Sequence, residues 1–329
     1  MKKLFLFLIL FLFSAQSFAG SCPDGSDPVK SISADGTYFV FKCGSNSNNS
    51  TSTSTSTSNN SSNNKNVITQ ITPAYHSGWK QQLRNDMIGM KSHNFQFEKD
   101  LKKSRRGSQY QRFELRDGDC GAYKDWDDCA NDRQRVEFTA DPMMASGKHC
   151  IAFSIMLDNS FVVTDPSPTA LGQIQQSGGP TGFAGGFKSN PGVLMFHAEN
   201  GYYDFDWLYL HGSRTDIKQL DLKFRLLPLE EMKGKWNDIS FCLDFAKNNM
   251  SLWVNGEKKF NINQPPTGLH LPKSIIFKYG IYQSFISWYK LEHNKNKMPT
   301  QIVYYDEIRR GSSIEEVDFN INPNLKAID

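Results

Sequence analysis

Short apolar runs fill the sequence from about Val67 to Asp329, and they restrict what this chain can fold into. Examples are CIAFSIML at 150–157, LDLKFRLL at 220–227 and SIIFKYGIY at 274–282. Apolar residues alternate or cluster within the runs, while Gly, Pro, Asn and Asp separate them, as is typical of β-strands and turns. No segment keeps a sustained helical period. The sequence therefore predicts an all-β domain in which two antiparallel sheets pack face to face.

Residues 236–256 predict how two of these strands are connected. The segment WNDISFCLDFAKNNMSLWVNG contains two apolar runs joined by a turn at KNN, and Asn255 and Gly256 open a further turn. Strand pairs of this kind are typical elements of jelly rolls. We therefore expect a jelly-roll sandwich of the concanavalin-like type.

The N-terminal part of the chain is organised differently. Lys2 and Lys3 precede the apolar run LFLFLILFLF and the stretch SAQSFA, which is the order of a secretory signal peptide. Residues 45–64 are all Ser, Thr or Asn, a composition too polar to offset its ordering entropy. We predict a signal peptide over 1–19, a small Cys-stapled module over 20–44, a flexible linker over 45–66 and the main domain over 67–329.

Six cysteines lie beyond the expected signal peptide, and none forms a CxxC pair. Export to an oxidising compartment favours disulfides over metal thiolates. We expect one bridge between Cys22 and Cys43, which would staple the small module. A second bridge between Cys120 and Cys129 would pin the Asp-rich loop DGDCGAYKDWDDCAND. Both pairs are close in sequence and flank turn-forming residues.

The charge balance excludes one broad class of function. The chain has a formal net charge of +3, and loss of Lys2 and Lys3 with the signal peptide would leave +1. A nearly neutral surface does not suit general nucleic-acid binding, so a polyanion would need a local patch. The basic run LKKSRRG at 101–107 is interpreted as a solvated loop, with polyanion binding as the alternative. We expect no membrane span in the mature protein.

Alternate residues of a strand point to the same side of a sheet, so each run divides into two faces. In QRFELR the apolar face holds Phe113 and Leu115, and in RQRVEF it holds Val136 and Phe138. The opposite, polar faces of these and two further runs carry Arg112, Glu114, Arg116, Arg133, Arg135, Glu137, Gln173, Gln175, Lys278 and Tyr282. Each of these sets of alternating polar residues, taken alone, fits a solvated sheet face with cross-strand ion pairs. Together they predict one polar site.

These faces resemble the motifs of jelly-roll polysaccharide lyases, a group that spans alginate lyases, heparin lyase I and glucuronan lyases. QRFELR and RQRVEF look like the R-x-E-L-type motif, LGQIQQ resembles the Q-I-H motif, and IIFKYGIYQ is similar to YFKAG-x-Y-x-Q. The order along the chain also matches, and VYYDEIRRG resembles the closing strand of the heparin-lyase-like branch. The resemblance covers residues 75–312 and implies a lyase acting on a uronic-acid-containing polysaccharide.

The resemblance also implies how such a site works. Breaking a 4-linked uronate by β-elimination requires removal of the C5 proton, so arginine and amide donors have to neutralise the adjacent carboxylate. Arg112, Arg135 and Gln173 would do this, and Tyr282 would protonate the departing oxygen. Lys278 would lower the pKa of Tyr282. The further substrate contacts expected are Arg116, Gln175, Lys278 and Gln283.

The general base is left open, because Gln175 stands where alginate lyases have the histidine of Q-I-H. Either Tyr282 acts as both base and acid, or a histidine elsewhere supplies the base. His197 in VLMFHAENG and His149 in GKHCIAF are the nearest candidates. His149 shares its parity with Ile151 and better fits a core or edge position, so His197 joins the expected catalytic residues.

Two other functions would use similar residues. A carbohydrate-binding sandwich without turnover would keep the arginines and aromatic residues, and the missing histidine favours it. A glycoside hydrolase would need two carboxylates across a cleft, whereas Glu114 and Glu137 share strand faces with arginines. We retain the lyase as the first hypothesis and the binding module as its alternative.

The remaining expectations concern metals, assembly and location. The histidines lack HExxH-type spacing, and the Asp-rich loop lacks EF-hand spacing. We therefore expect no cofactor, although the sequence is compatible with a structural calcium ion. Cys150 and Cys242 lie in expected strands, where a bridge or two buried thiols would both fit. We expect a monomer that is secreted or periplasmic.

Overall fold

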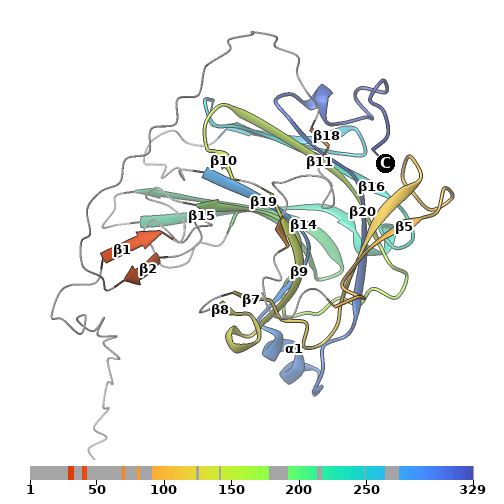
Figure 1. Cartoon of the computed structure of the whole chain (residues 1–329). Coiled ribbons are helices and arrows are strands. Elements are labelled where there is room, and N and C mark those ends of the chain that lie inside the picture. The colour runs from red at the N-terminus through yellow and green to blue at the C-terminus, as the bar shows by residue number, and fades with distance from the viewer. Residues whose placement is uncertain are drawn as a thin grey trace, which may run out of the picture. The chain divides into compact units, whose positions relative to one another are not determined.

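The structure is a computed structural model of the whole chain (Figure 1). It describes residues 91–328 except 124–125, 141, 178–191, 213–216, 248 and 264–273, together with four short strands nearer the N-terminus. The chain divides into two compact units, Met1–Ser58 and Asn59–Asp329.

In the first unit the described residues form one antiparallel hairpin, made of β1 (Val29–Ile32) and β2 (Phe39–Lys42). The expected signal peptide, the Cys22 to Cys43 bridge and the linker lie outside the described residues and stay predictions.

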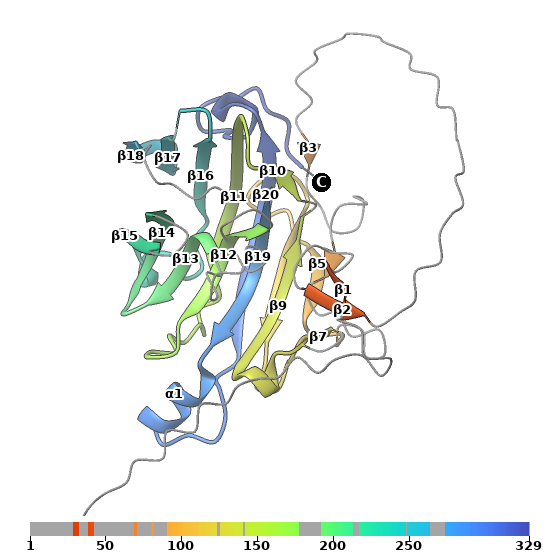
Figure 2. The same cartoon turned by 90° about the vertical axis from the view of Figure 1, so that its left-hand side faces the viewer.

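The second unit is a sandwich of two antiparallel sheets, which Figure 2 shows one behind the other. We call the first the site sheet. Its strands, in spatial order, are β15 (Ile217–Pro228), β14 (Tyr202–Gly212), β13 (Gly192–Glu199), β12 (Thr169–Ser177), β19 (Ser274–Ser284), β9 (Arg133–Thr139) and β4 (Lys80–Gln81), with β10 (Met143–Met144) also paired to β19.

We call the second the opposite sheet. Its strands, in spatial order, are β18 (Glu257–Asn263), β17 (Asn249–Val254), β16 (Asn237–Asp244), β11 (Lys148–Leu157), β20 (Gln301–Gly311), β6 (Gln109–Leu115) and β5 (Phe95–Lys99), with β3 (Thr69–Gln70) also paired to β20. A short hairpin of β7 (Ala122–Tyr123) and β8 (Trp126–Asp127) lies outside both sheets.

The core lies between the sheets and is built from the apolar faces that the alternation predicts. Large side chains such as Phe113, Phe153, Trp207, Phe277 and Tyr305 are at most 2% exposed. Burying such side chains contributes about 1.5–3 kcal/mol each relative to exposure, so the apolar alternation decides which face turns inward. The opposite face of the site sheet, turned away from this core, is called its outer face below.

The expected strands and the two-sheet sandwich are confirmed, including the pairing of β16 with β17 and the further turn at Asn255 and Gly256, which joins β17 to β18. One helix was not expected: α1 (Ile286–Glu292), which follows β19 directly. With seven residues it is too short to show a helical period in the sequence.

Two disulfides are present among the described cysteines. Cys120 pairs with Cys129, as expected from their spacing. Cys150 pairs with Cys242 across β11 and β16, which settles the alternative left open by the sequence in favour of a bridge.

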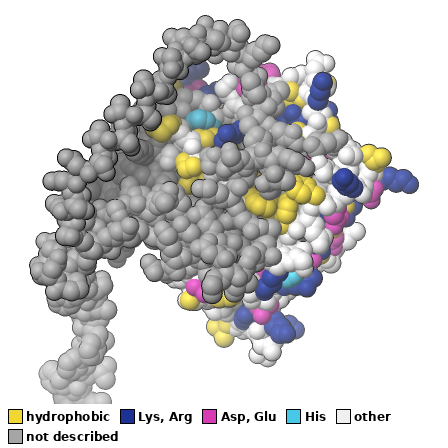
Figure 3. Space-filling model, in the orientation of Figure 1, with side chains coloured by type: hydrophobic (Ala, Val, Ile, Leu, Met, Phe, Trp, Pro, Cys, Tyr) yellow, Lys and Arg dark blue, Asp and Glu magenta, His cyan; other side chains and the backbone are white. Residues whose placement is uncertain are grey.

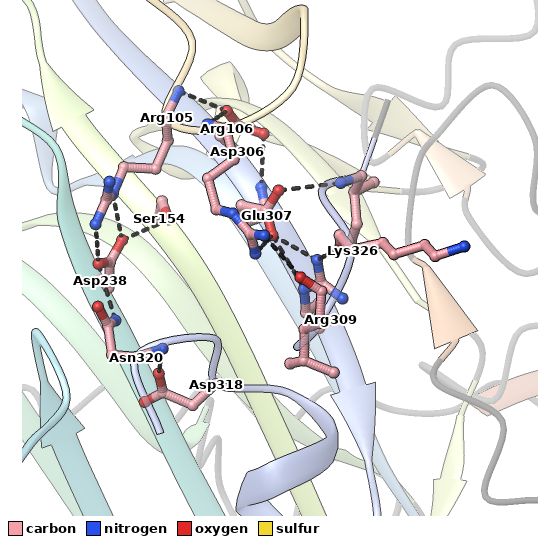
Figure 4. A network of polar contacts seen from close by, with 12 residues as sticks. Arg105, Arg106, Ser154, Asp238, Asp306, Glu307, Arg309, Asp318, Asn320 and Lys326 are labelled. Atoms are coloured by element: carbon pink, nitrogen blue, oxygen red, sulfur yellow. Dashed lines mark hydrogen bonds and ion pairs between the residues drawn. The ribbon is translucent and has the colours of Figure 1, made fainter. Parts of the chain in front are cut away.

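The basic run before β6 is a structural element of the opposite sheet (Figure 4). Arg105 makes two hydrogen bonds of 2.8–3.0 Å with the carboxylate of Asp238 on β16. Arg106 contacts Glu307 on β20 and donates to the carbonyl of Leu325 near the C-terminus. These two arginines therefore tie the 101–107 loop to the outer face of the opposite sheet, far from the face that carries Tyr282.

Candidate active site

One row of residues crosses four strands of the site sheet at the same level. Arg135 on β9 pairs with Tyr282 on β19, Tyr282 with Ala170 on β12, and Ala170 with His197 on β13. Directly opposed residues of a sheet point to the same side, so all four face outward. Neighbouring strands are about 4.8 Å apart, which separates the backbones of Tyr282 and His197 by about 10 Å, with only a methyl group between them.

The Tyr282 side chain is held by two arginines of β9. Arg133 Nε donates to Tyr282 Oη at 2.8 Å, and the Arg135 guanidinium lies 4.2 Å from the centre of the ring. Burial is the largest influence on the pKa of Tyr282 and raises it; Arg135 and Arg133 lower it, but the net pKa stays above the usual value. The phenol is therefore protonated at neutral pH.

Arg135 is itself fixed by Asp128, which lies on the loop before β9. Asp128 accepts two hydrogen bonds from Arg135, at 2.5 and 2.6 Å, a bidentate pair with both residues buried. Arg135 also donates to Glu137 at 3.3 Å, and Glu137 accepts from Gln173 Nε2 at 2.7 Å. A continuous polar chain thus runs from Asp128 to Gln173 along the outer face.

The disulfide-closed loop places Asp128 at this point. Cys120 and Cys129 bridge the loop, and the Asp128 backbone donates to the Gly121 carbonyl at 2.8 Å. The Gly121 and Arg133 amides bind Asp128 in turn, through its carboxylate and its carbonyl respectively. The loop is therefore closed covalently and by hydrogen bonds on both sides of Asp128.

His197 has its own carboxylate partner. Its Nδ1 lies 2.9 Å from Asp206 Oδ2 on β14. An ionised carboxylate can only accept a hydrogen bond, so in the neutral ring Nδ1 is the nitrogen that carries the proton and Nε2 the one that does not. Lys223 on β15 lies 3.7 Å from the same carboxylate.

A cation and an aromatic ring extend this face beyond His197. Arg225 on β15 lies over the ring of Tyr202 at 3.5 Å and 3.5 Å from the Asp204 carboxylate. Arg225 is 56% exposed at its side chain, so it remains accessible from solvent.

Lys278 and Gln175 lie on the same face but further along the strands, since Lys278 comes four residues before Tyr282 on β19 and Gln175 pairs with Ile276. Lys278 is buried and pairs in register with Gln173 and with Thr139. The expected action of Lys278 on Tyr282 is not what the structure shows, because the cations that lower the pKa of Tyr282 are Arg135 and Arg133.

Three expected site residues lie elsewhere. Arg112 and Arg116 belong to β6 and the residue after it, in the opposite sheet, where both bind Glu114. Gln283 points into the sandwich and hydrogen-bonds Gln134 and Gln301. The expectation that these three join Tyr282 is therefore wrong, although Arg135, Gln173, Gln175, Lys278 and His197 do share its face.

Three residues of the site were missed. Arg133 shares the parity of Arg135, so the strand pattern already contained it, but no role had been assigned to it. The sequence pattern did not indicate a role for Asp128 or Asp206, because their contacts join segments that are brought together only by folding.

The described residues show no group of three or more His, Cys, Asp or Glu side chains arranged to hold a metal ion. The carboxylates of the Asp-rich loop bind protein groups instead: Asp117 binds Lys290, Asp119 binds Lys91 and His93, and Asp128 binds Arg135. In the described part of the chain, no helix is long and apolar enough to cross a membrane.

The chain thus combines a two-sheet β-sandwich with an outer sheet face that carries arginines, amides, a tyrosine and a histidine. The family model of polysaccharide lyases matches residues 73–309, well over half of the chain. The chain belongs to this polysaccharide lyase family, and it is an enzyme of that class. No curated protein matches it.

Solved structures with a similar arrangement include the endo-β-1,4-glucuronan lyase of the fungus Trichoderma reesei. That enzyme is 14% identical, with 74% of this chain and 98% of that chain covered and a TM-score of 0.49. The alginate lyase AlgAT5 of polysaccharide lyase family 7 is also 14% identical, covering 72% of this chain and 95% of that one at a TM-score of 0.44. Alginate lyase A1-II' is 13% identical, with 71% and 94% covered and a TM-score of 0.46.

Proposed function

We propose that this lyase cleaves a polysaccharide containing 4-linked uronic acid by β-elimination, on the outer face of the site sheet. A base removes the C5 proton, the electron pair forms the C4=C5 double bond, and the C4–O4 bond breaks. An acid returns a proton to O4, so one chain becomes a shorter chain and an unsaturated uronate end. The observation that carries the proposal is the row Arg135, Tyr282, Ala170, His197.

The row supports a division of the two proton transfers. Tyr282, protonated because burial raises its pKa, is suited to give a proton to the departing oxygen. His197, with Nδ1 directed to Asp206, offers Nε2 as the base. The residue between them in the row is Ala170, whose side chain is a single methyl group. We therefore favour His197 as base over the alternative in which Tyr282 performs both steps.

Donors for the uronate carboxylate lie beside Tyr282. Arg135 and Gln173 are joined through Glu137, and Gln175 and Lys278 lie on the same face. We assign Arg135 and Gln173 to neutralising the carboxylate, and Gln175 and Lys278 to substrate binding. Neutralisation would stabilise the enolate-like charge that develops when the C5 proton leaves.

The test begins with substrate identity. Glucuronan, alginate, heparin and pectate are each incubated with the protein, and the ultraviolet absorbance of the new double bond is followed. Turnover on at least one of them is expected. If one polymer binds and none yields unsaturated product, a binding role replaces the proposed reaction.

Tyr282→Phe tests the acid. It removes the hydroxyl and keeps the ring, so turnover should fall by about 10²–10⁴-fold while binding survives. Tyr304→Phe is the matched control, because its hydroxyl binds Asp158 on the opposite sheet. Arg112→Ala should likewise leave turnover unchanged, since Arg112 lies on that other sheet.

His197→Gln tests the base. A fall in turnover comparable to that of Tyr282→Phe assigns the base to His197. Near-normal turnover would instead show that Tyr282 performs both transfers.

We also propose that the protein is secreted or periplasmic and acts as a monomer. The N-terminal sequence and the two described disulfides support export. Intact mass of the purified protein should show loss of residues 1–19, and peptide mapping should find Cys22 linked to Cys43. Free thiols at these two positions would contradict the stapled module.

A further inference from the structure

The exposed aromatic residues of the described chain are gathered at one place. Phe285 is 36% and Trp288 is 48% exposed, and among the aromatic side chains whose burial the structure describes no other is exposed to this degree. Their rings stack on each other with centroids 4.3 Å apart and planes 10° apart. Most of the aromatic side chains whose burial the structure describes are buried, so an exposed pair requires a separate explanation.

The pair adjoins the Tyr282 site. Phe285 comes three residues after Tyr282, at the end of β19, and α1 lies beyond that end (Figure 2). Arg133 connects the two places, because its Nε binds Tyr282 Oη at 2.8 Å and its guanidinium lies 5.2 Å from the centre of the Phe285 ring. The aromatic pair is thus continuous with the outer face of the site sheet.

The backbone holds the pair in a conformation that an aromatic residue rarely adopts. Phe285 has a φ of 55°, in the left-handed region. Asp132, next to Arg133, accepts hydrogen bonds from the Ser287 amide and hydroxyl at 2.9 and 2.7 Å, and the Ser167 hydroxyl donates to the Phe285 carbonyl at 2.5 Å. A residue in this conformation persists only where its surroundings enforce it, which often marks a functional position.

The chemistry of the pair matches one kind of occupant. A pyranose uronate has an apolar C–H face on its ring and a carboxylate at its edge. The site offers an open aromatic surface and, beside it, the cation of Arg133. Neither a purely apolar peptide nor a bare anion uses both features.

We propose that Phe285 and Trp288 form a binding subsite that stacks on a pyranose ring of the bound polysaccharide, away from the ring that is cleaved. The proposal rests on the proposed function, since it takes the ligand to be the chain that reaches Tyr282. Figure 3 shows the molecule from the side of Figure 1, where Lys and Arg side chains are interspersed with acidic and neutral ones.

The kinetic test uses Trp288→Ala on a long polymer, glucuronan or alginate, whichever is turned over. Stacking contacts of this kind contribute equally before and during the reaction, so KM should rise about three- to tenfold with kcat nearly unchanged. Trp288→Phe keeps a ring and should restore most of the affinity. Leu291→Ala, on the same helix and 84% exposed, is the matched control and should leave KM unchanged.

A binding test separates this subsite from the proposed reaction. In the Tyr282→Phe background, equilibrium binding of the same polymer is measured with and without Trp288→Ala by isothermal titration. Weaker binding with Trp288→Ala supports the subsite even if the unmodified protein forms no unsaturated product, in which case only the lyase mechanism fails. Unchanged affinity, or a fall in kcat at constant KM, overturns the subsite. Equal thermal unfolding midpoints show that the variants are folded.

Discussion

Gly280 connects the stability of the site sheet to the geometry of the site. It lies between Lys278 and Tyr282 on β19 and has a φ of +129°. A Cβ atom there would lie 2.2 Å from the Val136 carbonyl oxygen and 2.9 Å from the Cα of Glu137. Both obstacles are backbone atoms of β9, so neither can turn aside as a flexible side chain would. Alanine at this position would have to move β9 itself.

The size of the effect follows from two costs. The backbone conformation costs about 1–3 kcal/mol for a residue with a side chain, and forcing a methyl group into a packed site costs about 1–3 kcal/mol more. Gly280→Ala should therefore lower the free energy of unfolding by about 2–6 kcal/mol. At about 2–4 °C per kcal/mol, the unfolding midpoint should fall by on the order of 10 °C.

The assay is thermal unfolding followed by circular dichroism, with Gly201→Ala as the matched control. Gly201 has a φ of +79° but no atom within 4 Å of its Cβ position, so it carries a conformational cost without a clash. Gly280→Ala should be clearly the less stable of the two. Equal losses of stability would refute the close approach of β9 to β19, and with it the positions assigned to the arginines of β9.

Asp128→Asn keeps a hydrogen-bond acceptor for Arg135 but removes a negative charge that raises the pKa of Tyr282. The limb of the pH–rate profile due to Tyr282 should therefore move to lower pH. A limb that does not move would contradict the contact. Burial raises the pKa of Asp306 to about 7. The protonated carboxyl therefore contributes fully to the free energy of unfolding below about pH 4. This contribution, about 4 kcal/mol at most, is lost as the pH rises through 7. As the pH is raised from 5 to 8, the unfolding midpoint of Asp306→Asn should therefore increase relative to that of the unmodified protein. A difference between the two midpoints that stays constant over this range would exclude the titration of Asp306. Replacing Cys150 and Cys242 by alanine should cost about 2–4 kcal/mol, measured by urea unfolding without reductant; no loss would show that the bridge does not stabilise the fold.

The alternation of residues within single strands was readable from the sequence. In β9 and β19 the parity of apolar residues correctly placed Val136 and Ile281 in the core and Arg135 and Tyr282 on the other face. This works because the two-residue period of a strand is local and needs no knowledge of its neighbours. The same parity places Gln283 with Ile281, so its inward position was also contained in the sequence, and only the resemblance to a motif had suggested otherwise.

The pairing of strands was not readable in this way. β6 and β9 carry nearly the same Arg and Glu pattern, yet β6 pairs with β20 in the opposite sheet and β9 pairs with β19 in the site sheet. The pattern of each strand indicates which side is polar, but it does not indicate the neighbouring strand. The neighbouring strand is determined by contacts between segments that are distant in sequence. Arg112 was therefore assigned to a site that lies on the other sheet.

The sequence by itself determined the all-β class, the polar and apolar sides of each strand and the residue types suited to a uronate. The tertiary structure alone decided which polar sides meet, and it added partners from elsewhere. Asp128 reaches Arg135 from a disulfide-closed loop, and Asp206 reaches His197 from the neighbouring strand. The physical reason is that side-chain direction is set by local backbone geometry, whereas ion pairs depend on distances that exist only after the chain has packed.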